Sequence, residues 1–116
     1  MTGIIQRIST HLLDTSIGRP AAQVPVGLHT VADDGSTRLV GGGVTDNDGR
    51  VATLADGALA PGTFRLVYDT VGYFTAVHRK LFYPRIIVEV YLDGARAHYH
   101  VPVLASTYSY STYLGS

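Results

Sequence analysis

Short runs rich in Val, Ile, Thr and Tyr recur along the chain, and each is bounded by residues that favour a tight turn. The clearest turns are DDGS at 33–36, DNDG at 46–49 and DGAR at 93–96. Asp-Gly and Asn-Asp-Gly sequences readily adopt the positive φ that hairpins need, so successive strands can pair directly. Because short strands at this spacing are typical of sandwiches and barrels, the sequence predicts an all-β fold of seven to eight strands.

The expected strands follow from these turns and from the alternation of apolar and polar residues. In the first strand, Ile8, Thr10 and Leu12 share one face, which leaves His11 on the more polar face. The expected strands cover roughly residues 4–14, 26–32, 37–45, 50–54, 63–70, 85–92, 98–106 and 108–116.

Two segments depart from the strand pattern. Residues 71–80 are the single candidate helix, and Pro84 follows soon after it. The three glycines at 41–43 lie inside an expected strand without the lysine of a phosphate-binding loop. A bulge or a close approach of two backbones is therefore expected at these glycines.

The composition of the chain argues against several classes of protein. The chain has 116 residues and no cysteine, so one domain over residues 1–116 must be stabilised by packing, without disulfides or thiolate metal sites. Nine basic and nine acidic residues give a formal net charge of zero, which argues against a nucleic-acid or anionic-membrane partner. No apolar stretch approaches the ~18 residues of a membrane span, and the first residues lack the pattern of a signal peptide. A cytoplasmic protein is expected.

Histidines are the residues that could carry metal or acid–base chemistry. His98 and His100 lie two residues apart in an expected strand and so project from one face. His11 could complete a metal site of three imidazoles. Such a histidine pair is more often plain polar surface, so metal binding is a minority hypothesis. The serines near the end of the chain are disfavoured as nucleophiles, because no Gly-x-Ser-x-Gly elbow is present.

Four segments spread along the chain carry a family resemblance. They are STHLLDTSIGRPAAQVPVGL from residue 9, TDNDGR from residue 45, DTVGYF with the later FYP, and the final HYHVPVLASTYSYSTYLGS. Together they resemble the transthyretin-like family, most closely its enzymatic branch, the 5-hydroxyisourate hydrolases of urate breakdown. The resemblance covers essentially the whole chain in order.

The resemblance implies a fold and an assembly. The fold is a two-sheet, transthyretin-like β-sandwich with one short helix after the fifth strand. The assembly is a homotetramer, a dimer of dimers around a central channel whose walls hold the active sites. The tyrosine-rich end would then be a strand that lines the channel, where tyrosine can bury its ring and pair its hydroxyl.

The resemblance also implies site residues. The histidine of its Thr-His-x-Leu-Asp motif is His11, the arginine that closes Asp-Gly-Arg is Arg50, and the second histidine of His-Tyr-His is His100. These three are the expected catalytic residues, and His11 and Arg50 are also expected to bind substrate. Tyr113 and Ser116 belong to the terminal Tyr-Arg-Gly-Ser signature and are expected to contact the substrate.

Two residues depart from the family pattern, and one is added to the site by alternation. Leu114 replaces the signature arginine, and Arg85 stands where a glutamate is usual after FYP. That glutamate is one candidate partner of the lost arginine. Alternation places Ser111 on the face of Tyr113, as a further substrate contact, and Leu114 on the opposite face.

The implied reaction is hydrolytic opening of the six-membered ring of 5-hydroxyisourate, a small, flat purine oxidation product. His11 and His100 would share activation of water and delivery of the proton. Arg50 would hold substrate carbonyl oxygens, and His98 would support His100. No cofactor or metal is implied. The alternative is a non-catalytic, transthyretin-like small-ligand binding protein, which Leu114 favours and the retained histidines and arginine oppose.

Overall fold

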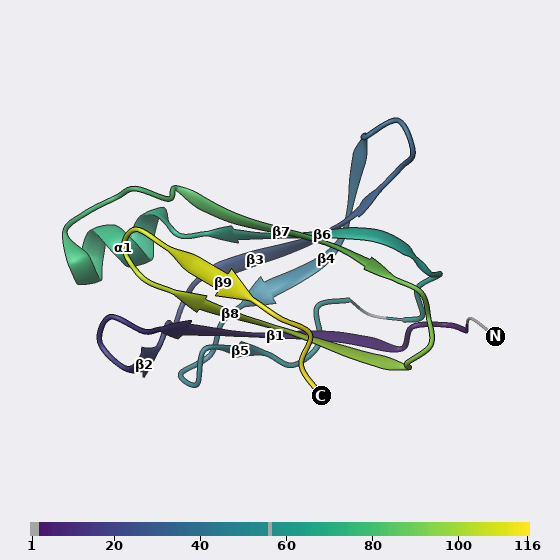
Figure 1. Ribbon diagram of the computed structural model, residues 1–116, viewed down its shortest axis with the longest axis horizontal. Coiled ribbons are helices and arrows are strands. Elements are labelled where there is room, and N and C mark those ends of the chain that lie inside the picture. The colour runs from purple at the N-terminus through teal and green to yellow at the C-terminus, as the bar shows by residue number, and fades with distance from the viewer. Residues whose placement is uncertain (1–2, 56) are drawn as a thin grey trace.

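Two β-sheets pack face to face with one short helix at one end (Figure 1). The structure, a computed structural model, describes residues 3–55 and 57–116. Within those residues, no helix is long and apolar enough to cross a lipid bilayer. The elements are β1 (Arg7–Asp14), β2 (Arg19–Pro20), β3 (Pro25–Val31), β4 (Thr37–Val44), β5 (Arg50–Val51), β6 (Gly62–Asp69), α1 (Val71–His78), β7 (Arg85–Leu92), β8 (His98–Ala105) and β9 (Tyr110–Thr112).

The strand order places the two ends of the chain in one sheet. That sheet runs β2-β1-β8-β9, with β5 paired to β1, and the other runs β4-β3-β6-β7. Strands β1 and β8 are parallel, from Arg7 opposite His98 to Asp14 opposite Ala105. This register brings the polar face of β1 beside the two histidines of β8.

The core lies between the sheets, as the alternation along β1 predicts. Ile8 and Leu12 are buried, and Thr10 between them is fully buried as well. The Thr10 hydroxyl donates to the carbonyl oxygen of Val101 at 2.7 Å and bonds the Tyr68 hydroxyl at 2.6 Å. Its polar atom is therefore paired, which removes most of the cost of burying it. The predicted two-sheet β-sandwich is confirmed.

Three predicted strands are shorter in the structure by three residues or more, two others by one residue, and β2 was not predicted. The first strand begins at Arg7, although Ile5 still bridges to Leu59. Strand β5 ends at Val51, because the chain then bends so that the Leu54 amide donates to the carbonyl oxygen of Ile8. At the end of the chain, only Tyr110–Thr112 pairs with β8.

The glycine run in β4 is confirmed as a close approach of two backbones, and a bulge lies just before it, at Val40. The β3–β4 register shifts between Leu28 and His29, opposite the start of the run. A Cβ atom built on Gly41 would lie 1.9 Å from the backbone oxygen of Leu54. Only glycine therefore lets the segment after β5 lie against β4.

A buried carboxylate ties α1 to the end of β1. Asp14 is 1% exposed, and its Oδ2 accepts a hydrogen bond from the Tyr73 hydroxyl at 2.6 Å and contacts His78 Nε2 at 2.6 Å. Its Oδ1 accepts from the hydroxyl and the amide of Ser16. Burial raises the pKa of Asp14, but the hydrogen bonds from Ser16, Tyr73 and His78 outweigh it, so the net shift of this pKa is downward.

Asp14→Asn is expected to lower the free energy of unfolding at neutral pH by about 1–3 kcal/mol, because a neutral amide loses charge-assisted bonds. A carboxyl whose folded-state pKa is depressed stabilises the fold above its unfolded pKa, which is 3.8 for Asp14. That contribution disappears as the pH falls through the lower, folded-state value. Urea denaturation of the wild type and of Asp14→Asn between about pH 3 and 7 measures the difference in their free energies of unfolding. A difference in stability that does not shrink toward acid would contradict this assignment.

Candidate active site

A cleft of about 300 Å³ lies beside the parallel pair β1 and β8. It brings together three of the predicted site residues, Arg50, His100 and Ser116. Its full lining is Arg7, Ser9, Thr10, Arg50, Val51, Ala52, His98, His100 and Ser116. The cleft therefore combines two cations, two imidazoles and the hydroxyls of Ser9 and Ser116, whereas the Thr10 side chain is fully buried.

His11 stands next to this cleft on β1. It pairs with Arg50 across the β1–β5 ladder, and its ring centroid lies 6.5 Å from that of His100. His11 Nε2 lies 2.7 Å from the carbonyl oxygen of Asp48. A carbonyl only accepts, so Nε2 carries the proton in the neutral ring, and Nδ1 has the free lone pair.

The turn before β5 is held by Asp46. Its Oδ1 accepts hydrogen bonds from the backbone amides of Arg50 and Asp48, both at 2.9 Å. The Arg50 amide is the largest cause of a lowered Asp46 pKa, with smaller contributions from the Asp48 amide and the charges of Arg50 and His11 that together outweigh desolvation. The anionic carboxylate thus fixes the backbone that presents both the Arg50 side chain and the carbonyl oxygen that orients His11.

His100 is connected to a series of hydrogen-bonded side chains that runs along the wall of the cleft. Ser9 Oγ lies 2.8 Å from His100 Nδ1 and 2.7 Å from His98 Nε2. On the far side, Arg7 Nη2 lies 3.3 Å from His98 Nδ1. Burial is the main cause that lowers the pKa of both imidazoles, and nearby positive groups lower it further. Both rings therefore favour the neutral form.

Arg7 and Ser9 were not predicted as site residues, although alternation along β1 had a signal for them. They occupy every second position before His11 and so share its face. The predicted proximity of His98 to His100 is confirmed, with Ser9 between them. Within the described part of the chain, no three His, Cys, Asp or Glu side chains are grouped closely enough to hold a metal ion.

The end of the chain is fastened against His100. The Gly115 amide donates to the His100 carbonyl oxygen at 2.9 Å, and Arg96 Nη1 donates to the Gly115 carbonyl oxygen at 2.8 Å. A Cβ atom on Gly115 would lie 2.7 Å from His100 Cδ2 and 3.1 Å from its carbonyl oxygen. Glycine at this position therefore lets the tail close on His100 and places Ser116 in the cleft.

Two predicted contacts lie elsewhere in the single chain. Ser111 lies on β9, opposite Leu104 of β8, and its side chain is exposed. Tyr113 is 57% exposed and lines a second, apolar cleft. Neither residue is part of the lining around His100, so their contact with substrate stays a prediction.

Comparison with known proteins decides the family. The profile of the HIUase/Transthyretin family matches residues 8–115. The chain belongs to the HIUase/Transthyretin family. It is 44% identical over 110 residues to the 5-hydroxyisourate hydrolase of Salmonella dublin, which covers 94% of this chain and 80% of the relative.

Solved structures of both branches of the family share the fold. The 5-hydroxyisourate hydrolase of Klebsiella pneumoniae superposes with a TM-score of 0.83 at 30% identity, covering 97% of this chain and 100% of that one. Sea bream transthyretin in complex with thyroxine gives a TM-score of 0.84 at 26% identity and covers 94% of each chain. The fold alone therefore does not separate catalysis from binding within the family, and the residues of the cleft must do so.

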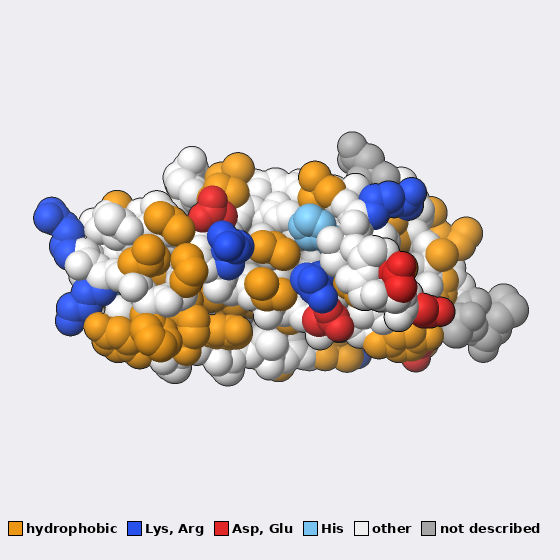
Figure 2. Space-filling model, turned by 90° about the horizontal axis from the view of Figure 1, so that it is seen from above, with side chains coloured by type: hydrophobic (Ala, Val, Ile, Leu, Met, Phe, Trp, Pro, Cys, Tyr) orange, Lys and Arg blue, Asp and Glu red, His pale blue; other side chains and the backbone are white. Residues whose placement is uncertain are grey.

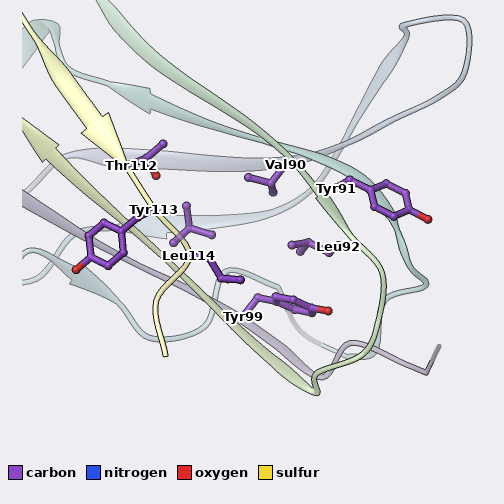
Figure 3. Close-up of a pocket in the computed structure, with 8 residues that line it drawn as sticks. Val90, Tyr91, Leu92, Tyr99, Thr112, Tyr113 and Leu114 are labelled. Carbon is purple, nitrogen blue, oxygen red and sulfur yellow. The ribbon is translucent and has the colours of Figure 1, made fainter. Parts of the chain in front are cut away.

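Leu114, which departs from the family signature, lines the apolar cleft between the edge of β7 and the tail. This cleft has a volume of about 300 Å³. Figure 3 shows Val90 and Leu92 of β7 facing the segment that carries Leu114, whereas the Tyr113 ring turns away from β7. The cleft is lined by Val90, Tyr91, Leu92, Tyr99, Val101, Thr112, Tyr113 and Leu114.

The suggested partnership between positions 85 and 114 is wrong within one chain. Arg85 begins β7 and pairs with Asp69, whereas Leu114 meets the far end of β7 at Val90 to Leu92. At ~3.3 Å per residue, five residues along a strand span roughly 17 Å. Leu114 does not line the cleft around His100, but it lines the apolar cleft together with Tyr113, so alternation did not place these two residues in separate surroundings.

Leu114→Arg is expected to change kcat/KM by less than about tenfold, or roughly 1.4 kcal/mol. Leu114 is 57% exposed, so an arginine can keep its charged head in water while its stem covers the apolar cleft. The change acts through the position of the tail and of Ser116. Steady-state kinetics of the variant measure the effect, with Leu114→Met as a control that conserves volume and polarity. A gain of a hundredfold or more would instead make the arginine a catalytic group.

Proposed function

We propose that this chain hydrolyses 5-hydroxyisourate to 2-oxo-4-hydroxy-4-carboxy-5-ureidoimidazoline, as an enzyme of urate degradation. The observation that carries the proposal is the grouping of His11, Arg50 and His100 around one cleft. The similarity over nearly the whole chain to relatives named 5-hydroxyisourate hydrolase supports it. The reaction opens the six-membered ring at a cyclic amide by adding water.

The cleft has the groups that such a hydrolysis requires. A base must take a proton from water, a donor must stabilise the oxygen that gains negative charge, and an acid must protonate the departing nitrogen. His11 and His100 share the first and last tasks, and the Arg50 guanidinium offsets charge on the substrate oxygens. Ser116 lines the same cleft and contacts the bound ring. No step requires a metal or a cofactor.

The decay of freshly made 5-hydroxyisourate tests the proposal. Generated in situ from urate, it should decay faster with this protein than in buffer. A chelator should leave the protein's activity unchanged. Loss of activity that zinc restores would instead make His98 and His100 metal ligands. Decay at the spontaneous rate would contradict the hydrolase function.

A small-ligand binding protein is the second candidate, because the apolar cleft beside Leu114 suits a hydrophobic ligand and a relative of the same fold is solved with thyroxine. The two cations and two imidazoles of the other cleft, with His11 beside it, oppose this function, since a binding site for a hydrophobic molecule has no use for them. Calorimetry with thyroxine distinguishes the candidates. Tight binding without hydrolysis would favour the second.

We also propose that the chain assembles as a cytoplasmic homotetramer, a dimer of dimers. A chain without cysteine gains nothing from an oxidising compartment. Figure 2 shows hydrophobic side chains gathered toward the end of the molecule that carries α1. Near that end, Phe82 and Tyr108 are 58% and 59% exposed, with their rings 5.6 Å apart. Exposed aromatic surface of this kind supports self-association.

Light scattering should give a mass about four times the 12.4 kDa of one chain. In the tetramer, Tyr113 and Ser111 reach the substrate only if a second copy completes the site, because neither lines the cleft of its own chain. Phe82→Ser, on the exposed aromatic surface, should shift the mass toward smaller species. A fully active monomer would contradict an active site built between subunits.

A further inference from the structure

Three hydrogen bonds link Arg7 to His100 through His98 and Ser9. The donors and acceptors that these groups have determine the direction of each bond. Arginine has only donors, so Arg7 can meet His98 Nδ1, 3.3 Å from its Nη2, only if that nitrogen is the acceptor. Neutral His98 then carries its proton on Nε2 and donates to Ser9 Oγ at 2.7 Å. Among the described residues, Ser9 Oγ has no hydrogen-bond partner besides these two imidazoles, so its single proton is donated to His100 Nδ1 at 2.8 Å.

His100 at the end of this chain must carry its own proton on Nε2. The opposite direction would need a proton on His98 Nδ1, which would then face the donors of Arg7. Burial and the neighbouring Arg7, His11, His98 and Arg50 lower the pKa of His100 and keep it neutral. A neutral imidazole with a fixed N–H is a good hydrogen-bond donor but a poor source of a whole proton.

We infer that Arg7 is a positioning residue that acts through His98 and Ser9 to hold His100 as the Nε2–H tautomer. His100 then donates a hydrogen bond to the oxygen that gains charge, while His11 alone exchanges the proton. The inference rests on the proposed hydrolysis of 5-hydroxyisourate and divides the roles that His11 and His100 otherwise share.

The proton and electron balance of the reaction closes with one histidine. Water gives a proton to His11 Nδ1, the nitrogen left free by the bond of Nε2 to the Asp48 carbonyl. The water oxygen forms a bond to the amide carbon, and the electron pair of the C=O bond moves to its oxygen, where His100 Nε2–H and Arg50 stabilise it. The pair then returns, the C–N bond breaks, and the His11 imidazolium gives its proton to the departing nitrogen.

Nitrogen NMR of histidine side chains tests the tautomer directly and needs no substrate. At about pH 8.5, where ordinary imidazoles are neutral, long-range ¹H–¹⁵N spectra should show His100 as the Nε2–H form in the wild type and in Arg7→Lys, which keeps a donor. In Arg7→Glu, the new carboxylate accepts a hydrogen bond from His98 Nδ1. The direction of the hydrogen bonds through Ser9 then reverses, and His100 should become the Nδ1–H form. Loss of a signal in His100→Gln assigns the resonance.

Kinetics at the same pH separate positioning from a structural role. Arg7→Lys should stay within about twofold of the wild type, whereas Arg7→Glu should lower kcat about tenfold or more with little change in KM. Arg38→Glu, the same charge reversal on β4 in the other sheet, should leave both constants unchanged. If Arg7→Glu does not fold, Arg7→Gln replaces it, since its amide oxygen can also accept from His98 and should raise the Nδ1–H population.

An Nδ1–H form of His100 in the wild type, or the same tautomer in every folded Arg7 variant, would overturn the inference. A wild type with the expected tautomer that does not hydrolyse 5-hydroxyisourate would instead contradict the proposed function. Equal loss of kcat in Arg7→Lys and Arg7→Glu would show that only packing around Arg7 matters. The NMR spectra therefore test the inference about the tautomer, and the decay of substrate tests the proposed function.

Discussion

Replacing His11 by alanine is expected to lower kcat by about 10²- to 10⁴-fold, the usual contribution of a positioned acid or base. The cause is the loss of an imidazole that the Asp48 backbone carbonyl orients through Nε2, which leaves the lone pair of Nδ1 free to take a proton. KM should change much less, because Arg50 and His100 still line the cleft. Steady-state decay of 5-hydroxyisourate measures both constants.

A matched histidine provides the control for this prediction. His29 lies on β3 in the other sheet, so His29→Ala should keep the wild-type kcat. Far-ultraviolet circular dichroism of the His11 variant should be unchanged, because His11 is only partly buried and its backbone pairing with Arg50 remains. A kcat within about threefold of the wild type would remove His11 from the proton-transfer step.

Replacing Arg50 by alanine is expected to lower kcat/KM by about 10²- to 10³-fold, in line with the loss of one preorganised donor to a developing oxyanion. The turn should survive, because it is the backbone amide of Arg50, not its side chain, that donates to Asp46. Both constants should change, with a higher KM and a lower kcat, since the guanidinium contacts the ring before and during the reaction. Kinetics over a wide range of substrate concentration separate the two.

Arg50→Lys distinguishes charge from geometry. Lysine keeps the positive charge but lacks the planar fork that can meet two oxygens at once. It should recover part of the lost kcat/KM, whereas Arg38→Ala on β4 should cost nothing. If Arg50→Ala were as active as the wild type, the charge partner of the oxyanion would have to be sought elsewhere in the cleft, at Arg7 in the first place.

Local sequence signals were enough for the architecture but not for the pairing of its strands. Asp-Gly turns and alternation along β1 led to the sandwich and to the buried face of Ile8 and Leu12. The parallel pairing of β1 with β8 joins segments about 90 residues apart, from Arg7 opposite His98 onward. Only the tertiary fold determines such a contact, since no turn connects the two strands.

At the C-terminal tail, local sequence signals predicted more strand than the structure contains. Alternation predicted a strand over 108–116, but only Tyr110–Thr112 pairs with β8. The Gly115 amide is bonded to the His100 carbonyl oxygen instead. Strand propensity could not reveal this contact, because it depends on the absence of a Cβ atom at Gly115 and on the position of His100.

Motifs named several of the residues that the structure groups at the cleft, but not the groups that support them. The Asp-Asn-Asp-Gly turn placed Arg50 at a well-anchored position, and Asp46 provides that anchor. Arg7 and Ser9 had no motif and become part of the site only through the parallel register that sets them beside His98 and His100. For such residues alternation along β1 gives only the shared face with His11, and the three-dimensional contact is needed to connect them to His98 and His100.

Hydrolysis of 5-hydroxyisourate at the cleft of His11, Arg50 and His100 can be tested in one experiment. The most direct measurement follows the decay of substrate, generated from urate, in parallel samples of wild type and of the double variant His11→Ala with His100→Ala at equal concentrations. The initial rate is expected to exceed that of buffer and to rise linearly with wild-type protein, whereas the double variant should match buffer. Equal decay in wild type, double variant and buffer, or equal acceleration by both proteins, would contradict hydrolysis at this cleft.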